Sequence, residues 1–189
     1  RAMPQLSEAE IERVVRGMWD NLGRVVAGFP PFATFHVYDP DGPVEVVGFM
    51  NRLKETPPAP DEKYIFVSGH YGNWEIIPLA VTQAGLQTTE IYRIANNPYV
   101  DQRIRDSSRT YGLKLSVTKG LEGGRELMAH LAEGSSIGVL IDQKYREGPA
   151  IPFFGHPANT QPVAVRWAMR FGLNLQTMSV QRLKGARFR

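Results

Sequence analysis

Residues 64–84 read YIFVSGHYGNWEIIPLAVTQA, and this stretch decides the fold of the chain. An apolar run at 64–67 and a second one at 76–81 flank the polar segment HYGNWE at 70–75. Short apolar runs on either side of a glycine-containing turn are typical of a buried strand followed by a helix. A histidine and a carboxylate therefore stand at a strand-to-helix turn, on the edge where open α/β sheets bind their ligands.

Strands and helices are predicted to alternate through the rest of the chain. The predicted strands lie at 44–47, 64–68, 88–94, 114–118, 137–141 and 175–182, and the predicted helices at 8–27, 48–54, 74–84, 97–111, 121–133 and 160–171. This alternation favours an α/β fold, with a mostly parallel central sheet flanked by helices. A length of 189 residues fits a single domain over residues 1–189 with a sizeable core.

The first predicted helix has a clear start and an apolar stripe. Ser7 and Glu10 have the spacing of a capping box. Apolar residues then recur at helical spacing, at Ile11, Val14, Val15, Met18, Trp19, Leu22, Val25 and Val26. Such a stripe can pack in the core or contact a membrane, and we expect core packing.

His70 and Glu75 are the candidate catalytic pair. Histidine, with an unperturbed pKa near ~6.5, can take a proton from an attacking hydroxyl at neutral pH. A carboxylate bound to the other ring nitrogen would fix the tautomer. Residues five apart on a continuous helix point about 140° away from each other, so the chain must bend at Gly72 for the pair to meet. We expect Asn73 to be the N-cap of a helix that starts at Trp74, with its backbone N–H groups facing a developing oxyanion.

Two other roles for His70 are that of an ordinary surface residue and that of a metal ligand. A histidine near a turn is often an ordinary surface or hydrogen-bonding residue. A metal site lacks support, because the chain has no Cys and because His36, His130 and His156 are not spaced as ligands with His70.

The composition limits the class of partner. The net charge is +3, with 42% hydrophobic and 22% charged residues, which is ordinary for a globular protein. The basic excess suits an anionic membrane surface, a phosphorylated lipid or an acidic carrier protein, and it equally suits a solvated basic face. No nucleic-acid motif, membrane-spanning apolar run or signal-peptide core is present in this sequence.

The segment HYGNWE after Val67-Ser68-Gly69 resembles the His-x-x-x-x-Glu element of the bacterial lipid A biosynthesis acyltransferases, the lauroyl and myristoyl transferases. Four more motifs of that family follow in the same order, over roughly residues 10–182. They are Tyr92-Arg93 before Asn97-Pro98, Arg109 before Tyr111-Gly112, Asp142-Gln143, and Pro152-Phe153-Phe154-Gly155. The resemblance implies a glycerolipid-acyltransferase-like fold.

The resemblance also implies an activity and a site. The expected reaction moves a fatty acyl group from acyl carrier protein to a hydroxyl of a lipid A precursor, with no metal or other cofactor. His70 would be the base and Glu75 its orienting partner. The expected substrate-binding residues are Arg93, Asp142, Arg109 and Asn73. The acyl donor, acyl carrier protein or CoA, would be a co-substrate.

Plainer interpretations of these residues stay open. Arg93 would contact a phosphate or carbonyl, or belong to a surface salt bridge. Arg109 lies in a charged helix that can be merely solvated, and Asp142 can be a turn cap. The segment at 152–155 would be a loop beside the acyl chain or part of the core.

The family also sets expectations for extent and location. Its members usually begin with a membrane-anchoring helix and continue well beyond the last strand predicted here, so we interpret the chain as a fragment. The expected place is the cytoplasmic face of the bacterial inner membrane, with peripheral attachment. The alternatives are an acyl-CoA-dependent enzyme acting on a phosphatidylinositol mannoside or glycerolipid, and a non-catalytic lipid-binding protein.

Overall fold

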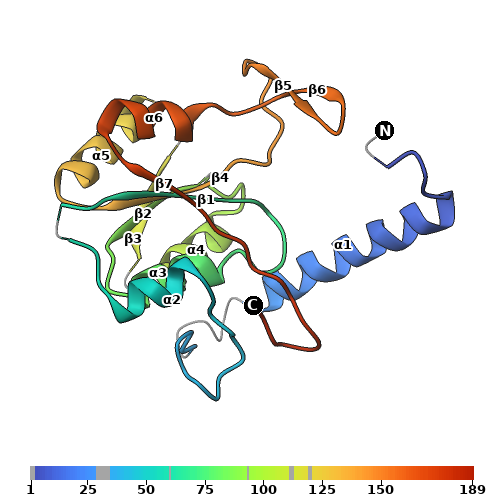
Figure 1. Cartoon of the computed structure of the whole chain (residues 1–189), viewed down its shortest axis with the longest axis horizontal. Helices are drawn as coiled ribbons and strands as arrows, with labels where there is room; N and C mark the ends of the chain where they lie inside the picture. Colours follow the sequence, from blue (N-terminus) through green and yellow to red (C-terminus); the bar gives the residue numbers. More distant parts are fainter. Residues whose placement is uncertain (1–2, 29–34, 60, 93, 111–112, 119–120) are drawn as a thin grey trace.

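The computed structural model describes residues 3–28, 35–59, 61–92, 94–110, 113–118 and 121–189. At its centre is a five-stranded sheet in the order β3-β2-β4-β1-β7 (Figure 1). These strands are β1 (Tyr64–Ser68), β2 (Thr88–Tyr92), β3 (Lys114–Thr118), β4 (Ser136–Leu140) and β7 (Asn174–Thr177). Every neighbouring pair in the sheet is parallel, so the predicted α/β fold with a parallel central sheet is confirmed.

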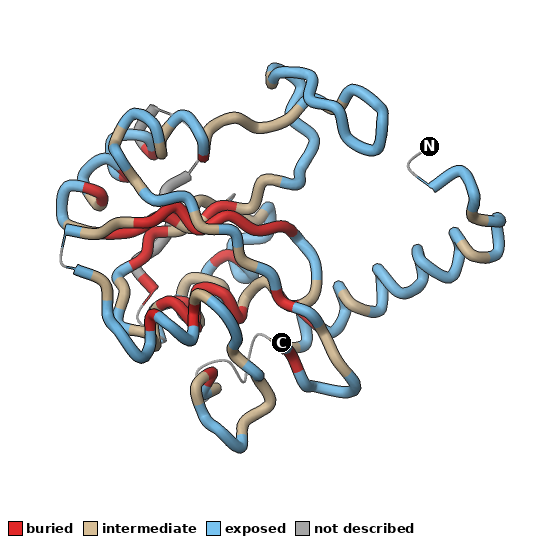
Figure 2. Tube along the Cα trace, viewed as in Figure 1, coloured by how far each residue is buried: buried red, intermediate tan, exposed pale blue. Residues whose placement is uncertain are grey.

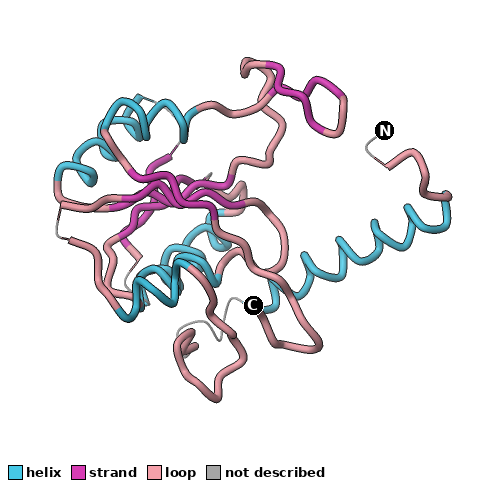
Figure 3. Tube along the Cα trace, in the orientation of Figure 1, coloured by secondary structure: helices cyan, strands magenta, loops and turns pink. Residues whose placement is uncertain are grey.

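Helices cover both faces of this sheet (Figure 3). One layer contains α2 (Phe49–Glu55), α3 (Ile76–Gln83) and α4 (Pro98–Thr110), and the other contains α5 (Leu121–Ala132) and α6 (Val163–Phe171). Tyr64 and Phe66 of β1 pack in the cluster that includes α3, whereas Ile65 and Val67 pack against α5 and α6. Because both faces of β1 are buried, its sequence is apolar throughout instead of alternating.

The first helix, α1 (Glu8–Gly28), begins as predicted but packs differently. Ser7 donates its backbone N–H and its hydroxyl to Glu10, each over 2.8 Å, which confirms the capping box. The helix extends away from the body of the molecule, and Val25 is the one residue of it that is buried (Figure 2). Trp19 is 62% exposed, so the expectation that this stripe packs in the core is wrong. The described part of the chain places no second layer against it.

A hairpin that the sequence did not predict follows β4. It consists of β5 (Ala150–Phe153) and β6 (His156–Asn159), which pair antiparallel. The two residues between them, Phe154 and Gly155, both have positive φ, as a type I′ turn requires. Phe153 and Phe154 are 63% and 59% exposed. Of the two interpretations left open for residues 152–155, burial in the core is therefore wrong.

Two predicted strands needed correction. Residues 44–47 form no strand: Val44 makes a single parallel bridge with Phe188, and the chain turns into α2 at Gly48. The last strand ends at Thr177, short of the predicted 182, because its neighbour β1 ends at Ser68, one residue beyond the register partner of Thr177.

Candidate active site

The carboxyl ends of β1 and β4 bring His70 and Asp142 together. The two strands are adjacent and parallel, and Ser68 is in register with Leu140. His70 lies two residues beyond the end of β1, and Asp142 lies two residues beyond the end of β4. Parallel strands expose their carboxyl ends at a common edge, so side chains far apart in sequence meet there. In Figure 1 this edge faces the side of the molecule from which α1 and the β5–β6 hairpin extend.

Asp142 binds His70 through both carboxylate oxygens. Oδ2 accepts the backbone N–H of His70 over 2.6 Å, and Oδ1 lies 2.7 Å from the ring nitrogen Nδ1. Burial acts to raise the pKa of Asp142, but the hydrogen bonds from His70 outweigh it and hold the pKa below its ordinary value. Asp142 is therefore ionised at neutral pH and favours the imidazole tautomer that donates from Nδ1, in which Nε2 can accept a proton.

The free nitrogen of His70 is accessible to a substrate. The imidazole is 35% exposed and the Asp142 side chain 43%. No hydrogen-bond partner for Nε2 occurs among the side chains that the structure describes. Trp74 packs edge-on against the ring, with 5.1 Å between ring centroids, and so supports its orientation. This arrangement can remove a proton from a hydroxyl placed at the sheet edge.

Glu75 does not occupy the place predicted for it. The carboxylate on the His70 ring is that of Asp142, and the described contacts include no hydrogen bond between Glu75 and His70. Glu75 is itself the N-cap residue of α3, with helical backbone angles. Burial raises its pKa, against the opposing effects of a hydrogen bond from the Trp74 side chain and of the His70 charge. Glu75 is thus a close electrostatic neighbour of His70, and desolvation favours its uncharged form.

Asn73 does not cap the helix with its side chain. The helix starts two residues later than predicted, at Ile76, and the backbone carbonyl of Asn73 accepts the N–H of Ile76 over 3.1 Å. The side chain is buried, and its Oδ1 has no hydrogen-bond partner within the described structure. Its predicted contact with substrate stays a prediction.

Gly72 sets the bend between His70 and Glu75, as the sequence predicts. Its φ is 60°, a conformation that residues with a Cβ rarely adopt. A Cβ here would lie 1.7 Å from the carbonyl oxygen of Val180, which belongs to the segment after β7. The Gly72 carbonyl accepts a 2.7 Å hydrogen bond from Asn21 of α1, whose own oxygen accepts one from Arg182. The turn that carries His70 is therefore held by α1 and by the end of the chain.

Replacing Gly72 by Ala is expected to lower the free energy of unfolding by about 1–3 kcal/mol for the backbone strain alone, with a further loss from the overlap at Val180. Urea titration measures the change. Gly172→Ala is the matched control, because Gly172 has a φ of 63° and nothing within 4 Å of its Cβ position. Equal losses in the two variants would mean that the contact with Val180 contributes nothing.

The described contacts do not bring Arg109 to His70. Arg109 lies in the last turn of α4, exposed, with Asp106 at 3.6 Å. Arg93 lies outside the described residues, as do Tyr111 and Gly112. Its predicted contact with substrate stays a prediction.

Sequence reasoning missed Asn21 and Arg182, which support the turn. Asn21 is one of many polar residues in an amphipathic helix. Arg182 belongs to the predicted strand 175–182, whereas β7 ends at Thr177. Their roles depend on contacts between segments far apart in sequence, for which spacing gives no signal.

Comparison with known proteins identifies the family. The model of the bacterial lipid A biosynthesis acyltransferases matches residues 1–188, which is nearly the whole chain. A comparison with curated proteins found no match. Within the described residues, none of the helices combines the length and the apolar character that crossing a bilayer requires. The match covers the sheet, the His70 turn and the Asp142 loop alike, and the chain belongs to the bacterial lipid A biosynthesis acyltransferase family.

Proposed function

We propose that this acyltransferase moves a fatty acyl group from the thioester of acyl carrier protein to a hydroxyl of a lipid A precursor. The family supports lipid A biosynthesis and acyl transfer. The observation that carries the mechanism is the pairing of Asp142 with Nδ1 of His70, which leaves Nε2 free at the open edge of the sheet.

The reaction begins with removal of a proton. His70 Nε2 takes the proton of the acceptor hydroxyl as its oxygen attacks the thioester carbonyl carbon, and Asp142 stabilises the imidazolium that forms. The new C–O bond completes a tetrahedral intermediate. When the intermediate collapses, the C–S bond breaks, and the leaving sulfur takes the proton from His70. The products are the acylated lipid and the free thiol of the carrier, and no metal is needed.

Direct attack on the thioester fits the residues around His70. The chain has no Cys, and Ser68, the serine nearest to His70 in the sequence, is buried with no base bonded to its Oγ in the described structure. An acyl-enzyme requires an activated nucleophile beside the base. The acceptor oxygen itself is therefore the nucleophile in this proposal.

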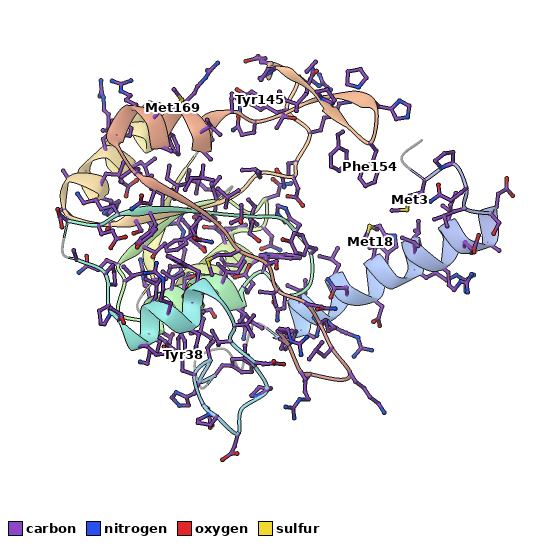
Figure 4. All side chains as sticks on the ribbon, in the orientation of Figure 1. Met3, Met18, Tyr38, Tyr145, Phe154 and Met169 are labelled. Carbon is purple, nitrogen blue, oxygen red and sulfur yellow. The ribbon has the colours of Figure 1, made fainter. Side chains whose placement is uncertain are left out.

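Exposed apolar side chains beside the sheet edge suit a lipid substrate at a membrane surface. Figure 4 shows Met18 of α1 and Phe154 of the hairpin on the same open side of the molecule. Both are more than half exposed. Apolar residues set among basic ones favour binding to anionic lipid. Lys144 and Arg146 are basic and exposed in the loop that joins β4 to the hairpin. This surface supports peripheral attachment to the cytoplasmic face of the inner membrane.

The donor is proposed to dock through charge. Acyl carrier protein is acidic, and the net charge of this chain is +3. Complementary charges raise the association rate more than the final affinity. Raising the ionic strength should therefore increase the KM for acyl carrier protein.

Arg93 is proposed to anchor a phosphate of the acceptor. It follows β2, whose carboxyl end lies at the same sheet edge as that of β1. Its planar guanidinium can donate two parallel hydrogen bonds to a phosphate. Arg93→Ala should raise the KM for the acceptor by about ten- to a hundredfold, since a charge-assisted bond contributes about 1.5–3 kcal/mol. Steady-state kinetics with each substrate varied in turn measures this change.

Arg103→Ala, on the exposed part of α4, is the control. If Arg93→Ala leaves the KM for the acceptor unchanged, or raises the KM for the donor equally, Arg93 is not the phosphate anchor.

The function is tested with a radiolabelled lipid A precursor and thin-layer chromatography. The protein is incubated with acyl-acyl carrier protein or with acyl-CoA, and a glycerolipid and a phosphatidylinositol mannoside are offered as competing acceptors. A faster-migrating labelled lipid that forms with acyl carrier protein supports the proposal. If product forms only with acyl-CoA, the donor is acyl-CoA and not acyl carrier protein. If product forms only on a competing acceptor, that acceptor is the substrate and not the lipid A precursor. No product with any pair would favour a lipid-binding role.

A further inference from the structure

Glu90 of β2 lies on the face of the sheet that α3 covers. The register aligns Phe66 of β1, Gly138 of β4 and Glu90 across three adjacent parallel strands. Residues in register on parallel strands point to the same face of a sheet. Phe66 packs in the cluster that contains Ile76 and Leu79 of α3. Glu90 is therefore a carboxylate set beside the apolar layer beneath α3.

Gly138 leaves room for the Glu90 side chain to lean across β4. A Cβ at residue 138 would lie 3.3 Å from Cγ of Glu90 and 3.6 Å from its Oε1. The side chain thus occupies the space above the glycine and extends from β2 toward β1. Glu75 stands at the start of α3, which follows β1 and packs on β2. The charge of Glu75 acts on the carboxyl group of Glu90, so the two groups are neighbours that come from different elements.

The surroundings of Glu90 disfavour a charge. The residue is partly accessible to solvent, yet burial raises the pKa of its carboxyl group to about 8, and the negative charge of Glu75 adds to that rise. Other charged side chains on this face include Asp101 and Arg105 of α4, which bind each other over 2.7 Å, and Arg52 and Glu62, which both interact with Tyr64 of β1. Two neighbouring carboxyl groups in a desolvated site do not ionise together.

We propose that Glu90 is a positioning residue for acyl transfer: its side chain, which lies over Gly138 on the face that α3 covers, supports the carboxyl group of Glu75 at the start of α3. The two carboxyl groups share one proton. Glu75 accepts a hydrogen bond from Trp74, and the Trp74 ring packs against the ring of His70. Glu90 thus acts on His70 through two intermediate side chains. The kinetic part of this inference rests on the proposed function.

Steady-state kinetics of Glu90→Leu and Glu90→Gln test the positioning role. The Leu variant should lose about tenfold in kcat with each KM unchanged, the effect of losing one hydrogen-bonding group next to a buried partner. The Gln variant has the shape of Glu90 and is always neutral, so it should keep wild-type kcat at pH 7. It should also lack the fall in kcat that ionisation of Glu90 causes above pH about 8. Glu126→Gln, exposed on α5, is the control.

Unfolding free energy against pH tests the shared proton without any substrate. The folded protein keeps a proton that the unfolded chain releases above the ordinary glutamate pKa, near ~4.3. The stability contributed by this proton is therefore lost as pH rises from about 4.3 to about 8. Over that range the unfolding equilibrium constant should rise by up to about tenfold per pH unit. Glu90→Gln should remove much of this slope, and Glu126→Gln should leave it unchanged.

Each measurement can overturn the inference. A Glu90→Leu variant with wild-type kcat would exclude the positioning role of Glu90. A Glu90→Gln variant whose kcat falls at alkaline pH as in the wild type would exclude it too. A pH dependence of stability that is the same in Glu90→Gln and wild type would remove the shared proton. If the wild type fails to acylate a lipid A precursor, the proposed function fails, and the stability measurement still decides whether the two carboxyl groups share a proton.

Discussion

His70→Ala should lower kcat by about 10²–10⁴-fold and leave the fold intact. The imidazole is partly exposed at the sheet edge and contributes a base more than it contributes packing. Its removal leaves Asp142 without the ring that it orients. The measurement is the initial rate of transfer with both substrates saturating, together with the circular dichroism spectrum and the melting temperature of the variant.

His36→Ala is the matched control, because His36 is exposed in the segment before α2, outside the sheet edge. It should keep the wild-type rate. A His70→Ala variant that retains more than about a tenth of wild-type kcat would exclude His70 as the base.

Asp142→Asn should lower kcat by about ten- to 150-fold, since a hydrogen bond to a charged group contributes about 1.5–3 kcal/mol. The amide has nearly the shape of the carboxylate but carries no charge to stabilise an imidazolium. Its NH₂ group can also turn toward Nδ1 and favour the wrong tautomer. The KM values should change little, because the ground-state complex places no new charge on His70.

Gln143→Glu is the control, because Gln143 is the exposed residue next to Asp142 and this variant also exchanges an amide and a carboxylate in the same loop.

The pH dependence of the free energy of unfolding gives a second test of Asp142. The pKa of Asp142 is held low in the folded state, so its contribution to stability is present above the ordinary aspartate pKa and is lost as pH falls through the lower folded value. The difference in stability between wild type and Asp142→Asn should therefore shrink in acid. A fully active Asn variant would leave Asp142 as a turn cap only.

The sheet could be predicted well from the sequence because each of its strands carries a local signal. Strands β1 and β3 lie at the predicted residues, and the start of β2 does too. Residues 44–47 have the same β-branched character, but within the described structure their pairing is limited to one bridge between Val44 and Phe188. A strand therefore needs a partner as well as a propensity.

The apolar stripe of α1 shows the limit of periodicity. The 3.6-residue spacing correctly predicts a helix with one apolar face, but it contains no information on what covers that face. The structure leaves Trp19 exposed. In the same way, the apolar segment at residues 152–155 forms an exposed hairpin tip, because positive φ at Phe154 and Gly155 turns the chain back.

The His-x-x-x-x-Glu spacing predicted the bend at Gly72, which the structure confirms, but it did not predict the carboxylate that binds the His70 ring. The partner of His70 comes from 72 residues away, at the end of the adjacent strand. Sequence spacing favours partners within one segment, whereas a parallel sheet joins residues from different strands at one edge.

The central claim is that His70 passes the acceptor proton directly to the leaving thiol, with Asp142 on its other nitrogen and no acylated enzyme. The most direct measurement is rapid chemical quenching of a single turnover, followed by intact-mass spectrometry of both protein and lipid. We predict that the lipid A precursor gains the mass of one acyl chain while the protein mass stays unchanged at every time point, and that His70→Ala forms lipid product at least about 10²-fold more slowly. A protein species heavier by one acyl chain that forms before the lipid product, or product formation by His70→Ala at more than about a tenth of the wild-type rate, would contradict it.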